Sequence, residues 1–217
     1  MKCDFFCRAC VTCVAIVYLC STMNTDEYTT LTDTVAEGYY TEKRSKFLAF
    51  AHHVESTEQI KALLASYRKL YYDARHVCYA YALGPDAAET RANDDGEPSS
   101  TAGKPILGQI VSHGLTDVLV VVVRYYGGVN LGTGGLIVAY RTAAAEALNK
   151  AGTVVRQVEE QVTVRFVYEQ MNNVMRVVKD MQPRIVDQQF DNCCVLTLSI
   201  RKSEAEQLRK RLDDALI

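Results

Sequence analysis

Apolar and polar positions recur along the middle of the chain with the periods of helices and of strands. The segment Ser56-Thr57-Glu58-Gln59 has the form of a capping box, and apolar side chains follow it at helical spacing, so we expect an amphipathic helix over 57–72. Large and small side chains alternate over 76–83, which predicts a strand. Residues 39–54 are expected to form two strands or one bent hairpin. The predicted helix over 57–72 is therefore flanked by strands, and we expect its apolar face to pack on the sheet that they form.

An unbroken run of Val and Leu marks the expected centre of this sheet. Residues 118–123 read VLVVVV, a pattern that suits a strand buried on both faces. A helix is predicted around 100–113, and an Ala-rich helix over 136–151 carries apolar side chains along one face. Gly152 follows that helix, and we expect it to end both the helix and the first domain.

The last part of the chain repeats these signals on a smaller scale. Apolar side chains alternate over 162–166 and again over 194–200, which predicts two strands. Helical spacing over 168–178 lies between them. Ser203 and Glu206 form a second capping-box pattern, which is expected to open a last helix. The order βαββα is that of a ferredoxin-like layer of two helices on an antiparallel sheet.

The pattern as a whole predicts an α+β protein of two domains, 23–152 and 153–217. A domain of about 65 residues buries only about 60% of its unfolded surface, so we expect the second domain to lean on the first. Residues 1–22 are expected to be an extension outside the fold, with Met23 as the natural start.

Five of the eight cysteines lie in that extension, at positions 3, 7, 10, 13 and 20. The spacing of the first three resembles the cluster-binding loop of radical S-adenosylmethionine enzymes, yet no predicted strand leads into it. The apolar run Ala9–Cys20 is too short to span a bilayer and lacks the small residues of a cleavage site. We therefore expect a plain extension in preference to an iron–sulfur loop, a secretory signal or a membrane anchor. The remaining cysteines are too few for a disulfide framework and indicate a reducing cytoplasm.

The charges are nearly balanced, with 24 Lys and Arg against 26 Asp and Glu, for a net charge of -2. This balance excludes a histone-like protein whose affinity comes mainly from counterion release. Any contact with nucleic acid must use a local patch, and the cations next to the glycine-rich loops are the candidates. They are Arg75, His76, Lys104, Arg124 and Arg141.

Nine of the twelve glycines fall between Gly96 and Gly135. The stretch LGTGG, Leu131 to Gly135, opens a predicted helix directly, so its free N–H groups could hold a phosphate or carboxylate. The alternative is tight packing of helix against strand, with Thr133 as the N-cap. No P-loop pattern supports the anion site, because Pro105 follows the one Gly-Lys pair.

Two further motifs allow both a functional and a structural interpretation. Arg124, in RYYGG, could stack on bases or grip a phosphate, and it could equally pair with Asp94, Asp95 or Glu97 and hold two loops together. Those three carboxylates lie in DDGEP and could suggest a magnesium site, but acids beside Gly and Pro more often serve turns and caps.

His76 and Cys78 lie two residues apart on a predicted strand and therefore share a face. Such a pair could suggest a thiol nucleophile with its base. No supporting Asn or Asp, oxyanion loop or known catalytic motif accompanies it, so the sequence does not indicate catalysis.

Three blocks of the sequence carry a resemblance to a known family. RHVCYAYALG, DDGEPSSTAGKPIL and VLVVVVRYYGGVNLGTGGLIVAY occur in the order and spacing of the YigZ/Impact family, and the resemblance covers roughly 38–151. It implies a βαβ-type first domain like domain IV of elongation factor G (ribosomal protein domain 2-like), and a tail like that factor's ferredoxin-like domain V. The eukaryotic Impact relatives regulate translation by binding a large co-activator protein and so restraining a stress-responsive kinase. The bacterial branch implies no reaction.

Two positions depart from the family's usual pattern. Ser100 replaces a Gly, so a position that could need positive φ must tolerate a side chain. Val138 replaces an Arg in the helix after LGTGG, which removes one cation from beside the proposed anion site.

The leading hypothesis is a non-enzymatic, translation-linked regulator that binds RNA, the ribosome or a translation-associated protein through a glycine-rich groove, with no cofactor, metal or membrane partner. One alternative is an enzyme acting on a phosphorylated or nucleotide ligand with a loop metal site, and another is a protein–protein adaptor using the tail domain. The predicted groove residues are Arg75, His76, Asp94, Asp95, Glu97, Thr101, Lys104, Arg124, Tyr125, Gly127, Gly128, Gly132, Thr133, Gly134, Gly135 and Arg141.

Overall fold

The computed structural model describes residues 26–191 and 193–216. They form two compact units, Tyr28–Val158 and a second unit that begins at Glu159 and includes Asp26 and Glu27. The division falls a few residues beyond the expected boundary, because β7 (Thr153–Gln157) pairs with β1 (Glu27–Leu31) and stays with the first unit. The predictions for residues 1–22 lie outside the described residues.

A five-stranded sheet in the order β2-β3-β6-β4-β5 forms the frame of the first unit. Its strands are β2 (Ala36–Glu42), β3 (Ser45–His53), β4 (His76–Leu83), β5 (Glu89–Asn93) and β6 (Val118–Tyr125). β6 is the middle strand and is antiparallel to both neighbours. Every residue from Val118 to Arg124 is buried, as expected for a strand covered on both faces.

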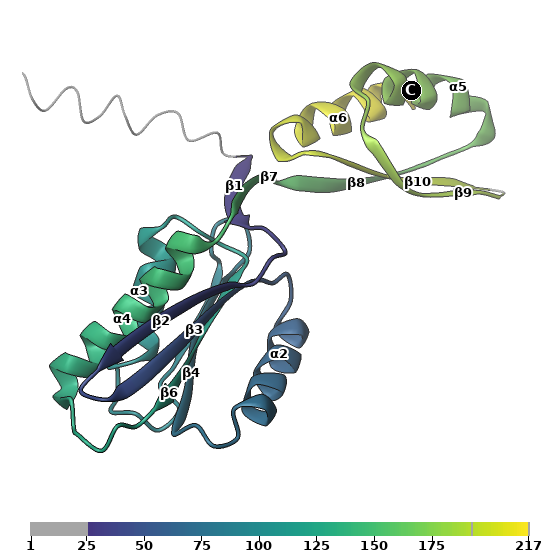
Figure 1. Cartoon of the computed structure of the whole chain (residues 1–217). Coiled ribbons are helices and arrows are strands. Elements are labelled where there is room, and N and C mark those ends of the chain that lie inside the picture. Colours follow the sequence, from purple (N-terminus) through teal and green to yellow (C-terminus); the bar gives the residue numbers. More distant parts are fainter. Residues whose placement is uncertain (1–25, 192, 217) are drawn as a thin grey trace, which may run out of the picture. The chain divides into compact units, whose positions relative to one another are not determined.

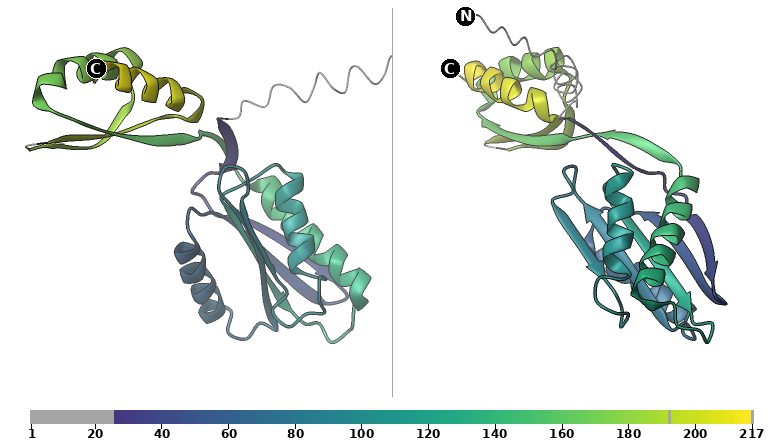
Figure 2. Two further views of the ribbon diagram at one scale, coloured as in Figure 1. Left: turned by 180° about the vertical axis from the view of Figure 1, so that it is seen from behind. Right: turned by 90° about the vertical axis from the view of Figure 1, so that its left-hand side faces the viewer.

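Helices cover both faces of this sheet. α2 (Thr57–Leu70) packs on one face, while α3 (Gly103–Ser112) and α4 (Gly132–Lys150) lie side by side on the other (Figures 1 and 2). The side chain of Ser56 accepts a hydrogen bond from the N–H of Gln59, so the cap predicted for α2 is confirmed. The small residues of α4 allow close approach to β2: a Cβ on Gly38 would lie 2.5 Å from the backbone nitrogen of Ala147. Each face of the sheet therefore has its own apolar core.

The second unit has the predicted βαββα order. Its sheet is ordered β8-β10-β9, with all neighbours antiparallel, and α5 and α6 lie on one face of it (Figure 1). The elements are β8 (Glu159–Phe166), the 3₁₀ turn η1 (Tyr168–Gln170), α5 (Met171–Met181), β9 (Arg184–Phe190), β10 (Cys194–Arg201) and α6 (Lys202–Ala215). Alternate apolar side chains of β8 and β10 pack against both helices to form a separate core.

The predicted capping box at the start of α6 is wrong. α6 begins at Lys202, one residue before Ser203, and its N-cap makes no side-chain hydrogen bond. The N–H of Ser203 instead donates to the carboxylate of Asp26, 3.1 Å away, and Glu206 lies 3.5 Å from Arg209. The capping-box pattern assigned the side chain of Glu206 as the acceptor for the N–H of Ser203. In the structure Asp26, far away in the sequence, accepts that hydrogen bond. Across residues 26–191 and 193–216, no helix has the length and apolar character needed to cross a membrane.

Candidate functional site

A cleft of about 600 Å³ opens in the first unit where β4 begins, β6 ends and α4 starts. Antiparallel pairing sets His76 on β4 opposite Arg124 on β6, and the N–H of Arg75 donates to the carbonyl of Arg124 at 2.9 Å. This register explains how segments about 50 residues apart in the sequence meet at one edge of the sheet. The cleft is lined by Arg75, His76, Glu97, Pro98, Arg124, Tyr126, Asn130, Leu131, Gly132, Thr133 and Leu136.

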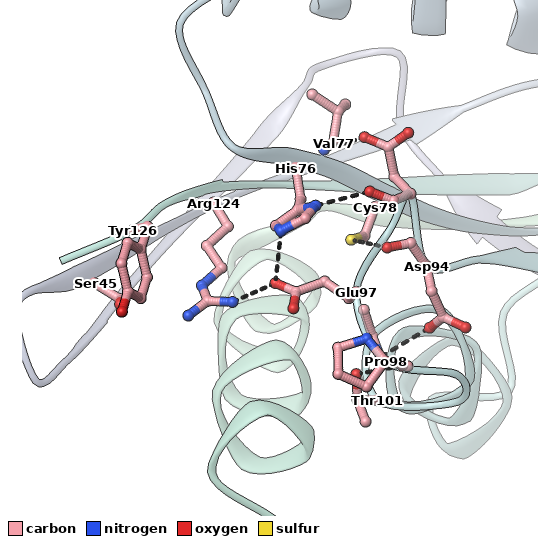
Figure 3. A network of polar contacts seen from close by, with 12 residues as sticks. Ser45, His76, Val77, Cys78, Asp94, Glu97, Pro98, Thr101, Arg124 and Tyr126 are labelled. Carbon is pink, nitrogen blue, oxygen red and sulfur yellow. Dashed lines mark hydrogen bonds and ion pairs between the residues drawn. The ribbon is translucent and has the colours of Figure 1, made fainter. Parts of the chain in front are cut away.

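Arg124 and Glu97 form a buried ion pair at the base of the cleft (Figure 3). Nη1 of Arg124 lies 2.5 Å from Oε1 of Glu97, and their side chains are only 6% and 3% exposed. The hydroxyl of Tyr140 donates to the same oxygen at 2.8 Å. The guanidinium also lies 5.6 Å from the ring centres of Phe47 and Tyr126. Arg124 therefore forms an ion pair that joins two parts of the protein, as the structural interpretation of the sequence expected. Its partner among the three candidate acids is Glu97.

The ring of His76 is oriented by the loop before Glu97. Its Nδ1 lies 2.7 Å from the carbonyl oxygen of Asp95. A carbonyl can only accept, so this contact requires a proton on Nδ1. Nε2 then faces Glu97 at 3.8 Å and carries a second proton only when the ring is charged. His76 and Glu97 therefore form an ion pair only when the imidazole ring is protonated.

Asp94 holds the start of α3. Its carboxylate accepts hydrogen bonds from the backbone N–H groups of Ser100, Ala102 and Gly103, at 2.8, 3.0 and 2.8 Å. Burial acts to raise the pKa of Asp94, but these three donors outweigh it and hold the pKa below its ordinary value. Asp94 is therefore a helix-capping carboxylate that stays ionised.

Asp95 binds different donors from Asp94. Its carboxylate accepts from the N–H of Val77 at 2.8 Å and pairs with Arg68 at 2.8 Å. The three acids of DDGEP thus face separate protein donors, which does not favour the alternative of a loop magnesium site. In the described ranges, no group of three His, Cys, Asp or Glu side chains is placed to hold a metal.

The glycine-rich segment is the first turn of α4. The helix begins at Gly132, four residues before the expected start, and its N-cap is Leu131 with no side-chain hydrogen bond. The expectation that Thr133 caps the helix is wrong, because Thr133 is the second residue within it. The first-turn N–H groups lack a side-chain acceptor, and Gly132 and Thr133 line the cleft. The positive end of the helix dipole therefore lies at this cleft.

Other predicted groove residues lie in neighbouring hollows. Lys104 and Arg141 line a groove of about 450 Å³ between α3 and α4. Gly134 and Gly135 line a smaller hollow beside Lys43. The structure thus divides the single groove expected from the sequence into three hollows around the N-terminal half of α4.

The remaining predicted residues have structural contacts. The hydroxyl of Thr101 donates to the carbonyl of Pro98 at 2.6 Å, and that of Tyr125 donates to Asp73 at 2.9 Å. Gly127 lies so close to the backbone of Arg44 that a Cβ would overlap it, and Gly128 has a φ of 84°. Thr101, Tyr125, Gly127 and Gly128 do not line the cleft.

Sequence reasoning missed the site role of Tyr140, and it missed five residues that line the cleft: Pro98, Tyr126, Asn130, Leu131 and Leu136. The spacing of Tyr140 placed it on the buried stripe of α4, and the structure adds that its hydroxyl bonds Glu97 and lies 3.3 Å from Sγ of Cys78. Cys78 also lies 3.1 Å from the carbonyl of Asp94. Burial raises the pKa of the Cys78 thiol, which disfavours the thiolate that a nucleophile needs. The geometry therefore does not support a catalytic pair of Cys78 with His76, whose Nδ1 is directed to Asp95.

Comparisons with known proteins agree with this architecture. Residues 43–148 match the family model described as the Impact N-terminal domain. The chain is 32% identical over 174 residues to "IMPACT family member YigZ" of Escherichia coli (strain K12), covering 79% of this chain and 85% of that protein. It is 50% identical over 109 residues to an "IMPACT family member" of Thermus thermophilus, covering 50% of this chain and 58% of the relative.

Two solved structures are similar to the chain to different degrees. One described as a crystal structure of a hypothetical protein is 30% identical, with a TM-score of 0.70, over 87% of this chain and 92% of that one. A structure titled as the two-domain translational regulator Yih1 is 30% identical over 54% of this chain and 46% of that one, with a TM-score of 0.37. The family model, the 32% identity to the Escherichia coli relative and the structure with a TM-score of 0.70 confirm the resemblance seen in the sequence, and the chain belongs to the IMPACT family.

Proposed function

We propose that this protein is a non-enzymatic, translation-linked RNA-binding protein whose cleft holds phosphate groups of RNA on the ribosome. The observation that carries the proposal is the meeting of Arg75 with the uncapped first turn of α4 in one cleft. Free N–H groups at a helix N-terminus and a nearby guanidinium are a combination that binds phosphate. The link to translation rests on membership of the IMPACT family, whose eukaryotic branch the sequence resemblance associates with translational regulation.

The charges of the cleft favour an anion. Glu97 neutralises Arg124 inside the protein. Arg75 is exposed and makes no ion pair with any residue that the structure describes. Its charge and the partial positive charge of the helix end are therefore left for a ligand. Tyr126 is 47% exposed and offers a ring on which a base can stack.

The neighbouring hollows extend the same surface. Lys104 and Arg141 line the groove beside the first half of α4, and Lys43 lines the hollow at Gly134 and Gly135. A phosphodiester chain that passes over this half of α4 would meet a cation at each hollow. Residues 23–152 carry 12 Lys and Arg against 15 Asp and Glu, so we expect this contact to be local, with little general affinity for nucleic acid.

The test is ribosome co-sedimentation and RNA filter binding at about 0.15 M salt. The variant Arg75→Glu should weaken binding at least tenfold. Lys69→Glu is the matched control, because it makes the same charge change on an exposed residue of α2, which covers the opposite face of the sheet. Absence of binding in both assays, or equal losses in the two variants, would disprove the proposal.

A truncation separates this function from that of a protein adaptor. Removal of residues 159–217, which keeps β7 with the first unit, should leave RNA binding by that unit in place if the cleft is the contact surface. Loss of partner capture only in that truncation would instead support an adaptor that uses the second domain.

A further inference from the structure

The two edges of the sheet in the second unit differ in regularity. At one edge, the pairing of β9 with β10 shifts between Thr197 and Leu198, which is a bulge. At the other edge, β8 pairs with β10 residue for residue from Glu159 to Phe166. Bulges protect an edge from pairing with another strand, whereas a regular edge presents unpaired backbone groups. β8 contains no Gly or Pro, so nothing in it interrupts a further pairing.

A groove of about 750 Å³ runs between the β8 edge and α6. Val162 and Val164 from β8 and Leu212 and Leu216 from α6 form its apolar lining, and Arg209 and Asp213 of α6 add two charged side chains. A strand added to β8 would direct every second side chain toward this lining. The groove therefore has the chemistry expected for the inward side chains of an added strand.

The outward side chains of β8 carry a pattern that complements itself. Residues Glu159, Gln161, Thr163 and Arg165 alternate with the buried ones and are exposed. Arg165 makes no ion pair with any residue in the described ranges. Glu159 is 44% exposed, and its two hydrogen bonds, from Arg184 and Ser199, both use Oε2. A cation and an anion thus lie at opposite ends of one face of the same edge strand.

We propose that the β8 edge is an interface for a second copy of this chain, paired antiparallel across a two-fold axis at Val162. Opposed residues of antiparallel strands lie on the same face. This register sets Glu159 of each copy opposite Arg165 of the other, and Gln161 opposite Thr163. It also sets the two Val162 side chains against each other beside the groove. A two-fold axis requires such self-complementarity, which an unrelated strand would have to match by chance.

The test exchanges charges between two variants of the full chain. Arg165→Glu and Glu159→Arg each place like charges at both ends of the interface, so each should raise the dimer dissociation constant at least about tenfold. An equal mixture of the two variants restores both opposite-charge pairs and should dimerise as the wild type does. Sedimentation velocity over a wide range of concentrations measures the dimer dissociation constant of the wild type, of each variant and of the mixture. Arg176→Glu, an exposed residue of α5, is the control that should leave association unchanged.

Thermal unfolding of each variant alone shows that it is folded before mixing. Restoration of the dimer only in the mixture would confirm the proposed register. A wild-type protein that stays monomeric at every concentration would overturn the proposal. The β8 edge would then be free to pair with a strand of another protein. A wild-type dimer that neither variant weakens, or that the mixture does not restore, would overturn it as well.

Discussion

Nη1 of Arg124 lies 2.5 Å from Oε1 of Glu97, and this buried contact joins the central strand to the loop before α3. The pair removes from solvent one of the five candidate cations beside the glycine-rich loops. Its role is to hold the base of the cleft, while Arg75 presents the free charge.

Replacement of Arg124 by Ala should lower the free energy of unfolding by about 3–5 kcal/mol, because the carboxylate of Glu97 would remain buried without its cation. The double variant Arg124→Met with Glu97→Gln should lose less unfolding free energy than the sum of the losses in the single variants Arg124→Met and Glu97→Gln. Urea denaturation measures both, with Arg75→Ala as an exposed control that should change stability little. A loss below about 1 kcal/mol for Arg124→Ala would contradict the buried pair.

Arg75→Ala should reduce the salt dependence of RNA binding. Loss of one phosphate contact lowers the slope of log K against log salt by about 1. Lys69→Ala should leave the slope unchanged. Equal slopes for Arg75→Ala and the wild type would mean that Arg75 does not contact a phosphate.

Ser100→Gly should stabilise the first unit by about 1 kcal/mol, since Ser100 has a φ of 65°, where a Cβ is strained. Ser99→Gly is the control: Ser99 has no positive φ, so Gly there should be neutral or slightly destabilising. Thermal unfolding distinguishes the two. If Ser100→Gly lowers the melting temperature, contacts of the Ser100 side chain must outweigh the strain.

His52 should make stability depend on pH near neutrality. Burial lowers the pKa of His52 below its ordinary 6.5, and its Nε2 lies 2.7 Å from the hydroxyl of Tyr67. Between the folded and unfolded pKa values the unfolded chain binds a proton that the folded chain does not, so stability falls as pH drops below 6.5. The double variant His52→Phe with Tyr67→Phe leaves no hydroxyl unpaired and should flatten this slope. An unchanged slope between pH 7 and the folded pKa would assign the effect to other groups.

Cys78 should resist alkylation in the folded protein. Burial raises its pKa, which lowers the thiolate fraction at pH 8, whereas Cys193 is exposed. Peptide mass spectrometry after brief iodoacetamide treatment should therefore find Cys193 modified well before Cys78, and both modified in denaturant. Equal rates in the folded protein would contradict the buried network around Tyr140.

The local pattern was sufficient for most elements. The Val run predicted the central strand because a strand buried on both faces has no polar positions. Alternation and helical spacing predicted the ranges of β8, α5, β10 and α6 in the second unit. They did not locate β9, because all its residues are exposed and its burial does not alternate. The pattern placed the start of α4 too late, since glycines are poor helix formers, and tertiary packing on the sheet overrides that preference.

The sequence by itself determined which side chains avoid water and which segments resemble the IMPACT family, because periodicity and motif spacing are local properties. It also brought Arg75, His76 and Arg124 to one site, through the glycine-rich loops beside them. Only the tertiary structure decided that Arg124 pairs with Glu97 and not with Asp94 or Asp95. The choice depends on the register of β4 against β6 and on where one loop crosses it. Hydrophobic periodicity does not encode such long-range geometry. From the sequence, any of the three acids could have paired with Arg124.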